Sequence, residues 1–143
     1  MYGKTFSTLG RELLPISQDA CAFYKAHSIY PDFGGVVYTP EEGQRLVESL
    51  GSHNKAMILQ NHGLLTTGKT VDEAVWWFIA MDRCCQSQLI AESASPNGYK
   101  DLKVIDDEVA MGVYKNIGDS QAGYMQFQPM YAKIVKEQPD LLE

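Results

Sequence analysis

The sequence predicts an α/β layered domain, because two patterns alternate along the chain. Short apolar runs of strand length are followed by longer segments with apolar residues at 3-to-4 spacing. Two of these longer segments, at 39–42 and 70–73, open with a threonine followed three residues later by a glutamate. That arrangement is typical of a capped first helical turn. Strands followed by capped helices favour a sheet covered by helices, here in one domain over residues 1–143.

The first expected pair of elements is a short strand at 35–38 and a helix over 40–50, with Pro at its first position and Gly just after its end. Leu46, Val47 and Leu50 fall on one face of this helix, which we therefore expect to face the core.

Two further strand segments are expected around a tight turn. The apolar run 55–60 and the extended segment 64–68 are separated by Asn61-His62-Gly63. A polar residue and a glycine between two such segments indicate a turn.

The longest helix is expected from Thr70 to about Ser93. One stripe along it keeps helical spacing and consists of Ala74, Phe78, Met81, Cys85 and Leu89. Trp76, Trp77 and Ile79 widen the apolar surface beyond one face, which predicts burial by a sheet and by another subunit. Two more helical stretches are expected, over 106–117 with Val109, Val113 and Ile117 in line, and over 120–137 with an interruption at Pro129.

The charge balance narrows the classes of partner. The chain has 12 Lys and Arg against 18 Asp and Glu, a formal net charge of -6. An acidic surface repels nucleic acid and anionic lipid, so neither is expected as a partner. We also expect no membrane span and no signal peptide, since no apolar run approaches the roughly 20 residues that a span requires. The three cysteines, Cys21, Cys84 and Cys85, are expected to be free thiols, and an odd number of them favours the cytoplasm.

Asn61-His62-Gly63 is the strongest candidate for chemistry. An imidazole at a turn between two strands can project into a cleft and bind a metal or move protons near neutral pH. His27 and His53 do not pair with another His or Cys at ligand spacing, and we expect surface or structural roles for both.

Several segments together resemble the class II aldolase/adducin family. The matching motifs are Gln60-Asn61-His62-Gly63-Leu64, the segment 68–74 (Gly-Lys-Thr-Val-Asp-Glu-Ala), and the segments 2–7, 18–24 and 33–37. The resemblance covers roughly residues 2–95. It implies a three-layer αβα sandwich of class II aldolase type, and an oligomer whose active site lies between subunits.

In that family the histidine that matches His62 is one of three ligands to a catalytic zinc or similar ion. The family's His-x-His pair would lie immediately before Met1, so we expect an N-terminally truncated version of the fold, with one metal ligand in three and no cofactor. The expected catalytic residues are then His62, Asp19 and Tyr24, and the expected substrate-binding residues are Asn61 and Gln18. Satisfied hydrogen-bonding groups are the alternative for Asp19 and Tyr24.

Three functions fit these observations. The first is a divergent, metal-independent enzyme that uses acid/base chemistry on a small carbonyl compound in an aldol, retro-aldol, enolisation or cyclisation step, and it is the one that we favour. The second is a non-catalytic adducin-like assembly protein. The third is a truncated form of a zinc-dependent aldolase, with Met1 as an internal methionine. A homo-oligomer is expected in each case.

Overall fold

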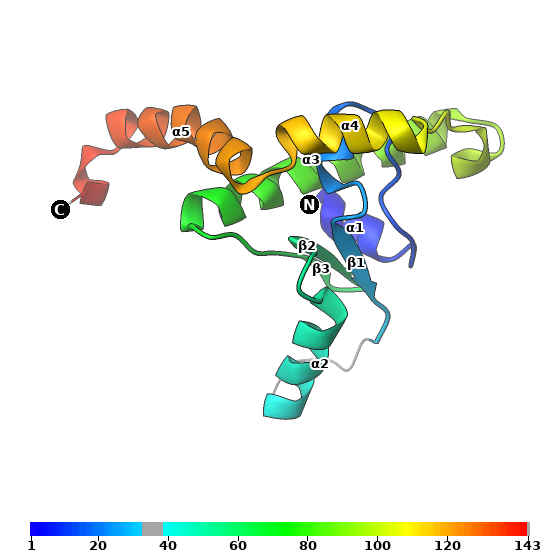
Figure 1. Ribbon diagram of the computed structural model, residues 1–143, viewed down its shortest axis with the longest axis horizontal. Helices are drawn as coiled ribbons and strands as arrows, with labels where there is room; N and C mark the ends of the chain where they lie inside the picture. Colours follow the sequence, from blue (N-terminus) through cyan, green and yellow to red (C-terminus); the bar gives the residue numbers. More distant parts are fainter. Residues whose placement is uncertain (33–38, 143) are drawn as a thin grey trace.

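The computed structural model describes residues 1–32 and 39–142, and helices and strands alternate along it (Figure 1). The expected strand at 35–38 lies outside the described residues. The elements, in chain order, are α1 (Tyr2–Ser7), η1 (Asp19–Phe23), β1 (His27–Tyr30), α2 (Pro40–Leu50), β2 (Ala56–Leu59), β3 (Gly63–Thr66), α3 (Val71–Ala94), η2 (Gly98–Asp101), α4 (Asp107–Ile117), α5 (Ser120–Glu137) and η3 (Pro139–Leu142).

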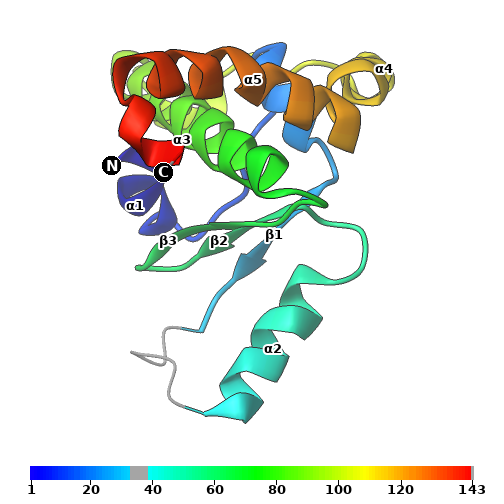
Figure 2. The same cartoon turned by 90° about the vertical axis from the view of Figure 1, so that its left-hand side faces the viewer.

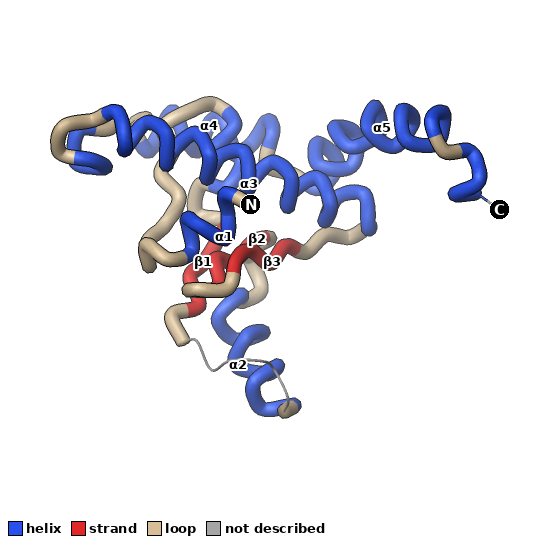
Figure 3. The backbone as a smooth tube through the Cα atoms, turned by 180° about the vertical axis from the view of Figure 1, so that it is seen from behind, coloured by secondary structure: helices blue, strands red, loops and turns tan. Residues whose placement is uncertain are grey.

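Within the described residues, three short strands form a small mixed sheet at the centre of the molecule (Figure 3). β1 pairs with β2 in parallel, with Ile29 opposite Ile58, and β2 pairs with β3 in the antiparallel direction, with Ile58 opposite Leu64. β2 is therefore the central strand, and its Ala56, Met57 and Ile58 are fully buried. A strand covered on both faces is a continuous apolar run rather than an alternating one.

β2 and β3 confirm the strand segments expected at 55–60 and 64–68. β2 is one residue shorter at each end, whereas β3 begins one residue earlier, at Gly63, and ends two residues earlier. β1 has no counterpart in the sequence prediction. Its four residues, His-Ser-Ile-Tyr, carry no clear apolar pattern, and only Tyr30 among them is buried. Pairing with the apolar β2 is what makes this segment a strand.

Helices cover both faces of the sheet, as Figure 2 shows. α2 lies on one side, while α1 and α3 lie on the other, with α4 and α5 farther from the sheet on that second side. α2 is joined to β1 by the Ser49 hydroxyl, which donates to the Ile29 carbonyl at 3.3 Å. The arrangement confirms the predicted α/β class with helices in layers about a sheet.

The expected ends of α2 are confirmed, but its expected burial against the core is not. The helix has its Thr39 cap, Pro at its first position and Gly51 at its end, as predicted. None of its residues is buried, however, and Val47 is 63% exposed. Leu46 and Leu50 are only partly buried, so the apolar face of α2 is incompletely shielded from solvent.

α3 confirms the predicted long helix, and Met81 and Cys85 of the expected stripe are buried, although Phe78 is not. Phe78 is 47% exposed, whereas Trp77 is fully buried. The buried face includes two polar residues that have hydrogen bonds: Glu73 accepts from Trp77 Nε1 at 3.0 Å, and Gln88 accepts from the Leu14 backbone N–H at 2.8 Å. The residues buried on α3 are Glu73, Trp77, Met81, Cys84, Cys85 and Gln88.

α5 crosses α3 near its N-terminus and then extends away from the body of the molecule (Figures 1 and 3). The crossing depends on Gly123, where a Cβ atom would lie 2.6 Å from the Trp77 ring. The expected interruption at Pro129 is wrong, since the helix runs through it. Pro129 is exposed and so is Met125, whose carbonyl loses its helical donor there, so water can bond that carbonyl instead. Over the described ranges, no helix has the length and apolar character needed to cross a membrane.

Candidate functional site

His62 lies in the three-residue turn that joins β2 to β3. The backbone N–H of His62 donates to the Leu59 carbonyl at 3.0 Å, and the N–H of Asn61 donates to the Ser7 carbonyl at the end of α1 at 3.2 Å. Asn61 has φ of +58° and Gly63 has φ of +144°, a value that side chains rarely tolerate. This turn is thus fixed at both sides of His62, and it holds the imidazole exposed to solvent.

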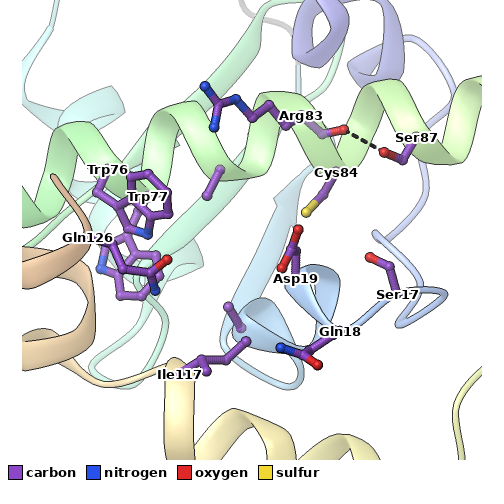
Figure 4. Close-up of a pocket in the computed structure, with 12 residues that line it drawn as sticks. Ser17, Gln18, Asp19, Trp76, Trp77, Arg83, Cys84, Ser87, Ile117 and Gln126 are labelled. Atoms are coloured by element: carbon purple, nitrogen blue, oxygen red, sulfur yellow. Dashed lines mark hydrogen bonds between the residues drawn. The ribbon is translucent and has the colours of Figure 1, made fainter. Parts of the chain in front are cut away.

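Asp19 and Gln18 line a cavity between η1, α3 and α5, of about 190 Å³ (Figure 4). The Cys84 sulfur points toward Asp19, and Gln126 reaches in from α5. Gln18 and Asp19 are expected site residues because they lie in the segment 18–24 that resembles the family. The other lining side chains come from the loop before η1, from η1 itself and from α3, α4 and α5, and no motif joins these segments, so the sequence does not reveal them. The other polar or aromatic lining residues are Ser17, Trp76, Trp77, Arg83, Cys84, Ser87 and Gln126.

Tyr24 follows η1 and is partly buried, but it is not among the residues that line the Asp19 cavity. Its ring has the Lys25 ammonium 5.1 Å from its centroid. The pKa of Lys25 is raised by the neighbouring Tyr24 and Asp107. The Tyr24 hydroxyl is buried and has no hydrogen-bond partner among the described residues, which contradicts the alternative of a satisfied polar group, and the catalytic role of Tyr24 remains a prediction.

The structure does not bring His62 together with Asp19, Gln18 or Tyr24. The turn that carries His62 follows the C-terminal end of β1, since the Gln60 N–H donates to the Tyr30 carbonyl at 2.9 Å. The segment 18–24 instead precedes the N-terminal end of the same strand. Only Asn61 is adjacent to His62. Of the expected site residues, Asn61 is therefore the one that lies near enough to act on a substrate together with His62.

The three cysteines are buried and free, as predicted. Burial, helped by Asp19 and Cys21, raises the pKa of Cys84 to about 12, and burial also raises that of Cys85 to about 12. Thiols with such pKa values are protonated at neutral pH, and the thiolate is the nucleophilic form. The Cys84 thiol thus serves as an apolar wall of the Asp19 cavity.

His27 has a structural role, as expected. Its Nδ1 donates to the Phe23 carbonyl at 2.8 Å, and its Nε2 accepts the Leu13 backbone N–H at 3.1 Å. This tautomer requires a neutral ring, because a protonated Nε2 cannot accept. Burial accordingly lowers the pKa of His27 below its ordinary value of 6.5, against the opposing effects of the Phe23 carbonyl and Glu12.

A pH dependence of stability follows from His27. A histidine whose folded pKa lies below its unfolded pKa contributes stability above the unfolded value, and this stability is lost as pH falls below about 6.5. We expect the free energy of unfolding in urea to fall between about pH 7.5 and about pH 5.5, and the fall to be smaller in His27→Gln. His53→Gln, on an exposed loop, is the matched control and should keep the wild-type slope. Equal slopes in wild type and His27→Gln would contradict this account.

The residues described here do not fit a three-ligand metal site. Among the residues described, no group of three His, Cys, Asp or Glu side chains lies close enough together to hold an ion. Both ring nitrogens of His27 have partners in the protein, which removes it as a ligand. His62 supplies one exposed imidazole, and catalytic zinc ordinarily takes three protein ligands. The catalytic steps proposed below therefore involve only side chains of this chain.

Comparison with known proteins agrees with the predicted family and fold. The family model for the class II aldolase and adducin N-terminal domain matches residues 1–89. The chain belongs to this family.

Two curated relatives and one solved structure are similar to this chain over nearly its whole length. The chain is 38% identical to the decarboxylase NovR of Streptomyces niveus over 99% of this chain and 50% of the relative. It is 38% identical to the 4-hydroxy-3-prenylphenylpyruvate oxygenase/4-hydroxy-3-prenylbenzoate synthase of Streptomyces roseochromogenus, over 99% of this chain and 49% of the relative. The structure of L-fuculose 1-phosphate aldolase from Glaciozyma antarctica matches 98% of this chain and 50% of that chain, with a TM-score of 0.85 and 38% identity. The chain thus spans about half the length of the curated relatives it matches.

Proposed function

We propose that this chain is an aldolase-like enzyme that cleaves or forms a bond beside the carbonyl of a small molecule, with His62 as the proton-transfer group. The observation that carries the proposal is the turn at His62. Its backbone is fixed by Asn61 and Gly63 in conformations that side chains rarely adopt, and its imidazole is left exposed to solvent. Asn and Gly are the residues that adopt such φ values at little cost, so this pair specifies the turn and presents the imidazole from it.

The chemistry needs one base and one oxygen-binding group. In a retro-aldol step a neutral imidazole at His62 removes the proton from the β-hydroxyl, the bond between the α and β carbons breaks, and the electron pair passes to the carbonyl as an enolate. The imidazolium then returns its proton to the α carbon. The Asn61 amide, beside His62 on the same turn, is placed to donate to the carbonyl oxygen on which negative charge develops.

The relatives support a carbonyl substrate and leave its identity open. An aldolase, a decarboxylase and an oxygenase/synthase named for a phenylpyruvate each match nearly the whole of this chain, and the names of the aldolase and of the synthase point to carbonyl chemistry. Metal-independent chemistry is the form we propose for this chain, because the described residues bring no three His, Cys, Asp or Glu side chains close enough to hold an ion.

The test combines turnover with metal content. Purified chain is incubated with β-hydroxy carbonyl compounds and aromatic 2-oxo acids, with and without a chelator, and products are followed by NMR. We expect cleavage of at least one compound, little effect of the chelator, and zinc well below one per chain. Zinc near one per chain, lost in His62→Ala, would overturn the metal-independent part. Failure to turn over any carbonyl compound, in a protein that assembles, would favour an adducin-like assembly role.

Apolar side chains left exposed on α3 and α5 favour self-association. Phe78 is 47% exposed, Ile90 58%, Met125 58% and Tyr131 44%. Large exposed apolar patches are unusual in monomers and mark interaction surfaces. We propose that these helices are covered by another copy of the chain.

The oligomer is checked by its mass in solution. Light scattering at micromolar concentration should report a particle of at least twice the 16.0 kDa monomer. Tyr131→Lys should weaken the association, because it places a charge among apolar side chains. Lys133→Glu on the same helix, where the side chain is already charged and exposed, is the control. A monomeric wild-type protein would contradict the proposal.

A further inference from the structure

The amine of Lys55 lies among aromatic rings, apart from the sites considered so far. Lys55 immediately precedes β2, and its Nζ donates to the Gly118 carbonyl at 2.6 Å. The same Nζ lies 3.6 Å from the centroid of the Trp77 ring and 5.2 Å from that of Tyr114. Three separate parts of the chain thus meet at one primary amine.

A cavity opens at this amine. It has a volume of about 390 Å³, larger than the Asp19 cavity, and Tyr114 and Gly118 line it beside Lys55. Glu73 and Asp119 are the acidic groups in its wall, and Lys69 is a second, exposed lysine there. The volume suffices for a small organic molecule.

The surroundings of Lys55 favour its neutral form more than those of an ordinary lysine do. Burial lowers its pKa to about 7, although the charges of Glu73 and Asp119 act in the opposite direction. Near pH 7 about half of the Lys55 amines are then unprotonated, whereas an ordinary lysine with a pKa near 10.4 is neutral in well under about 1% of molecules. A neutral amine has the lone pair that attacks carbonyl carbon.

We propose that Lys55 is a carbonyl-capturing residue, whose Nζ forms a reversible imine with a small aldehyde bound in this cavity. The Nζ lone pair adds to the carbonyl carbon, a carbinolamine forms, and water leaves as the C=N bond closes. The protonated imine keeps one N–H, which can donate to the Gly118 carbonyl as the free amine does. Its positive charge lies against the Trp77 and Tyr114 rings, where a cation is attracted to the ring faces.

This inference goes beyond the function proposed for His62 and does not depend on it. The two sites share no residue, and Lys55 is at the opposite end of β2 from the His62 turn. The competing interpretation is a purely structural lysine that ties β2 to the α4–α5 junction. Both interpretations use the same contacts, so chemical reactivity is the property that separates them.

The experiment traps the imine in the intact, folded chain. Protein at about pH 7 is treated with acetaldehyde and cyanoborohydride, which reduces an imine to a stable ethylamine, and modified lysines are mapped by peptide mass spectrometry. We expect Lys55 to be modified roughly tenfold faster than Lys69, which lines the same cavity but is exposed. Near pH 9 the advantage of Lys55 should shrink, because the exposed lysines lose more of their protons there.

Two variants complete the test. Lys55→Arg keeps a cation and a donor for the Gly118 carbonyl but cannot form an imine, so labelling at position 55 should vanish while the thermal melt stays close to wild type. Lys69→Arg should leave the labelling of Lys55 unchanged. Lys55 labelled no faster than Lys69 in the folded protein would overturn the proposal, and so would labelling that appears only when circular dichroism shows unfolding.

Discussion

We expect His62→Ala to lower the turnover of the proposed carbonyl substrate by about 10²–10⁴-fold, the usual contribution of one acid/base group. The loss should fall on kcat, because the imidazole moves a proton in the transition state and binds little of the substrate beforehand. The urea midpoint should stay near that of wild type, since the side chain is exposed and the turn is held by backbone bonds of Asn61 and His62.

Two controls make the His62 result specific. His53→Ala removes another exposed imidazole, on the loop before β2, and should leave kcat nearly unchanged. Gly63→Ala should lower both stability and activity, because its φ of +144° is strained for any side chain. Wild-type turnover in His62→Ala would rule out the catalytic role of this turn. An unfolded His62→Ala would instead show that the ring is needed for the fold.

Trp77→Ala should lower the free energy of unfolding by about 3–5 kcal/mol, as expected for removal of a large buried aromatic side chain. Trp77 is fully buried, packs edge-on against Phe23 with ring centroids 5.9 Å apart, and donates to Glu73. It also lies beneath the Lys55 amine and against Gly123 of α5. The substitution therefore removes contacts between the α3 layer, β2 and the C-terminal helix at once.

Trp76→Ala is the matched control, since it makes the same chemical change one residue earlier on the same helix. Trp76 is only partly buried, so its removal should cost clearly less than that of Trp77. Urea titrations of both variants at one protein concentration give the comparison. A loss that is equal for both would mean that the buried face of α3 is not the one seen here.

Some features of the fold could be predicted because they depend on neighbours in the sequence. The starts of α2 and α3 follow from Thr39 and Thr70, whose hydroxyls accept the backbone N–H of the residue three positions later, at 3.4 Å and 3.2 Å. The His62 turn likewise depends on adjacent residues, namely Asn61 and Gly63 with positive φ. Hydrogen bonds that span three or four residues are encoded locally, so pattern is enough to find them.

Other features depend on which distant segments meet, and pattern could not supply them. β1 exists because β2 pairs with it, and Trp77 rather than Phe78 is buried because Phe23 and Gly123, from distant segments, pack against the Trp77 ring. Asp19 and His62 both lie in segments that resemble the family, and yet they lie beyond opposite ends of β1.

The sequence by itself determined the α/β class, the family, the helix starts and the exposed histidine turn. Only the tertiary structure decided which side chains share a cavity, and it placed the Lys55 amine against Trp77 and the Gly118 carbonyl. The physical reason is that burial, and with it the pKa of Lys55, is set by atoms contributed from β2, α3 and the α4–α5 junction together.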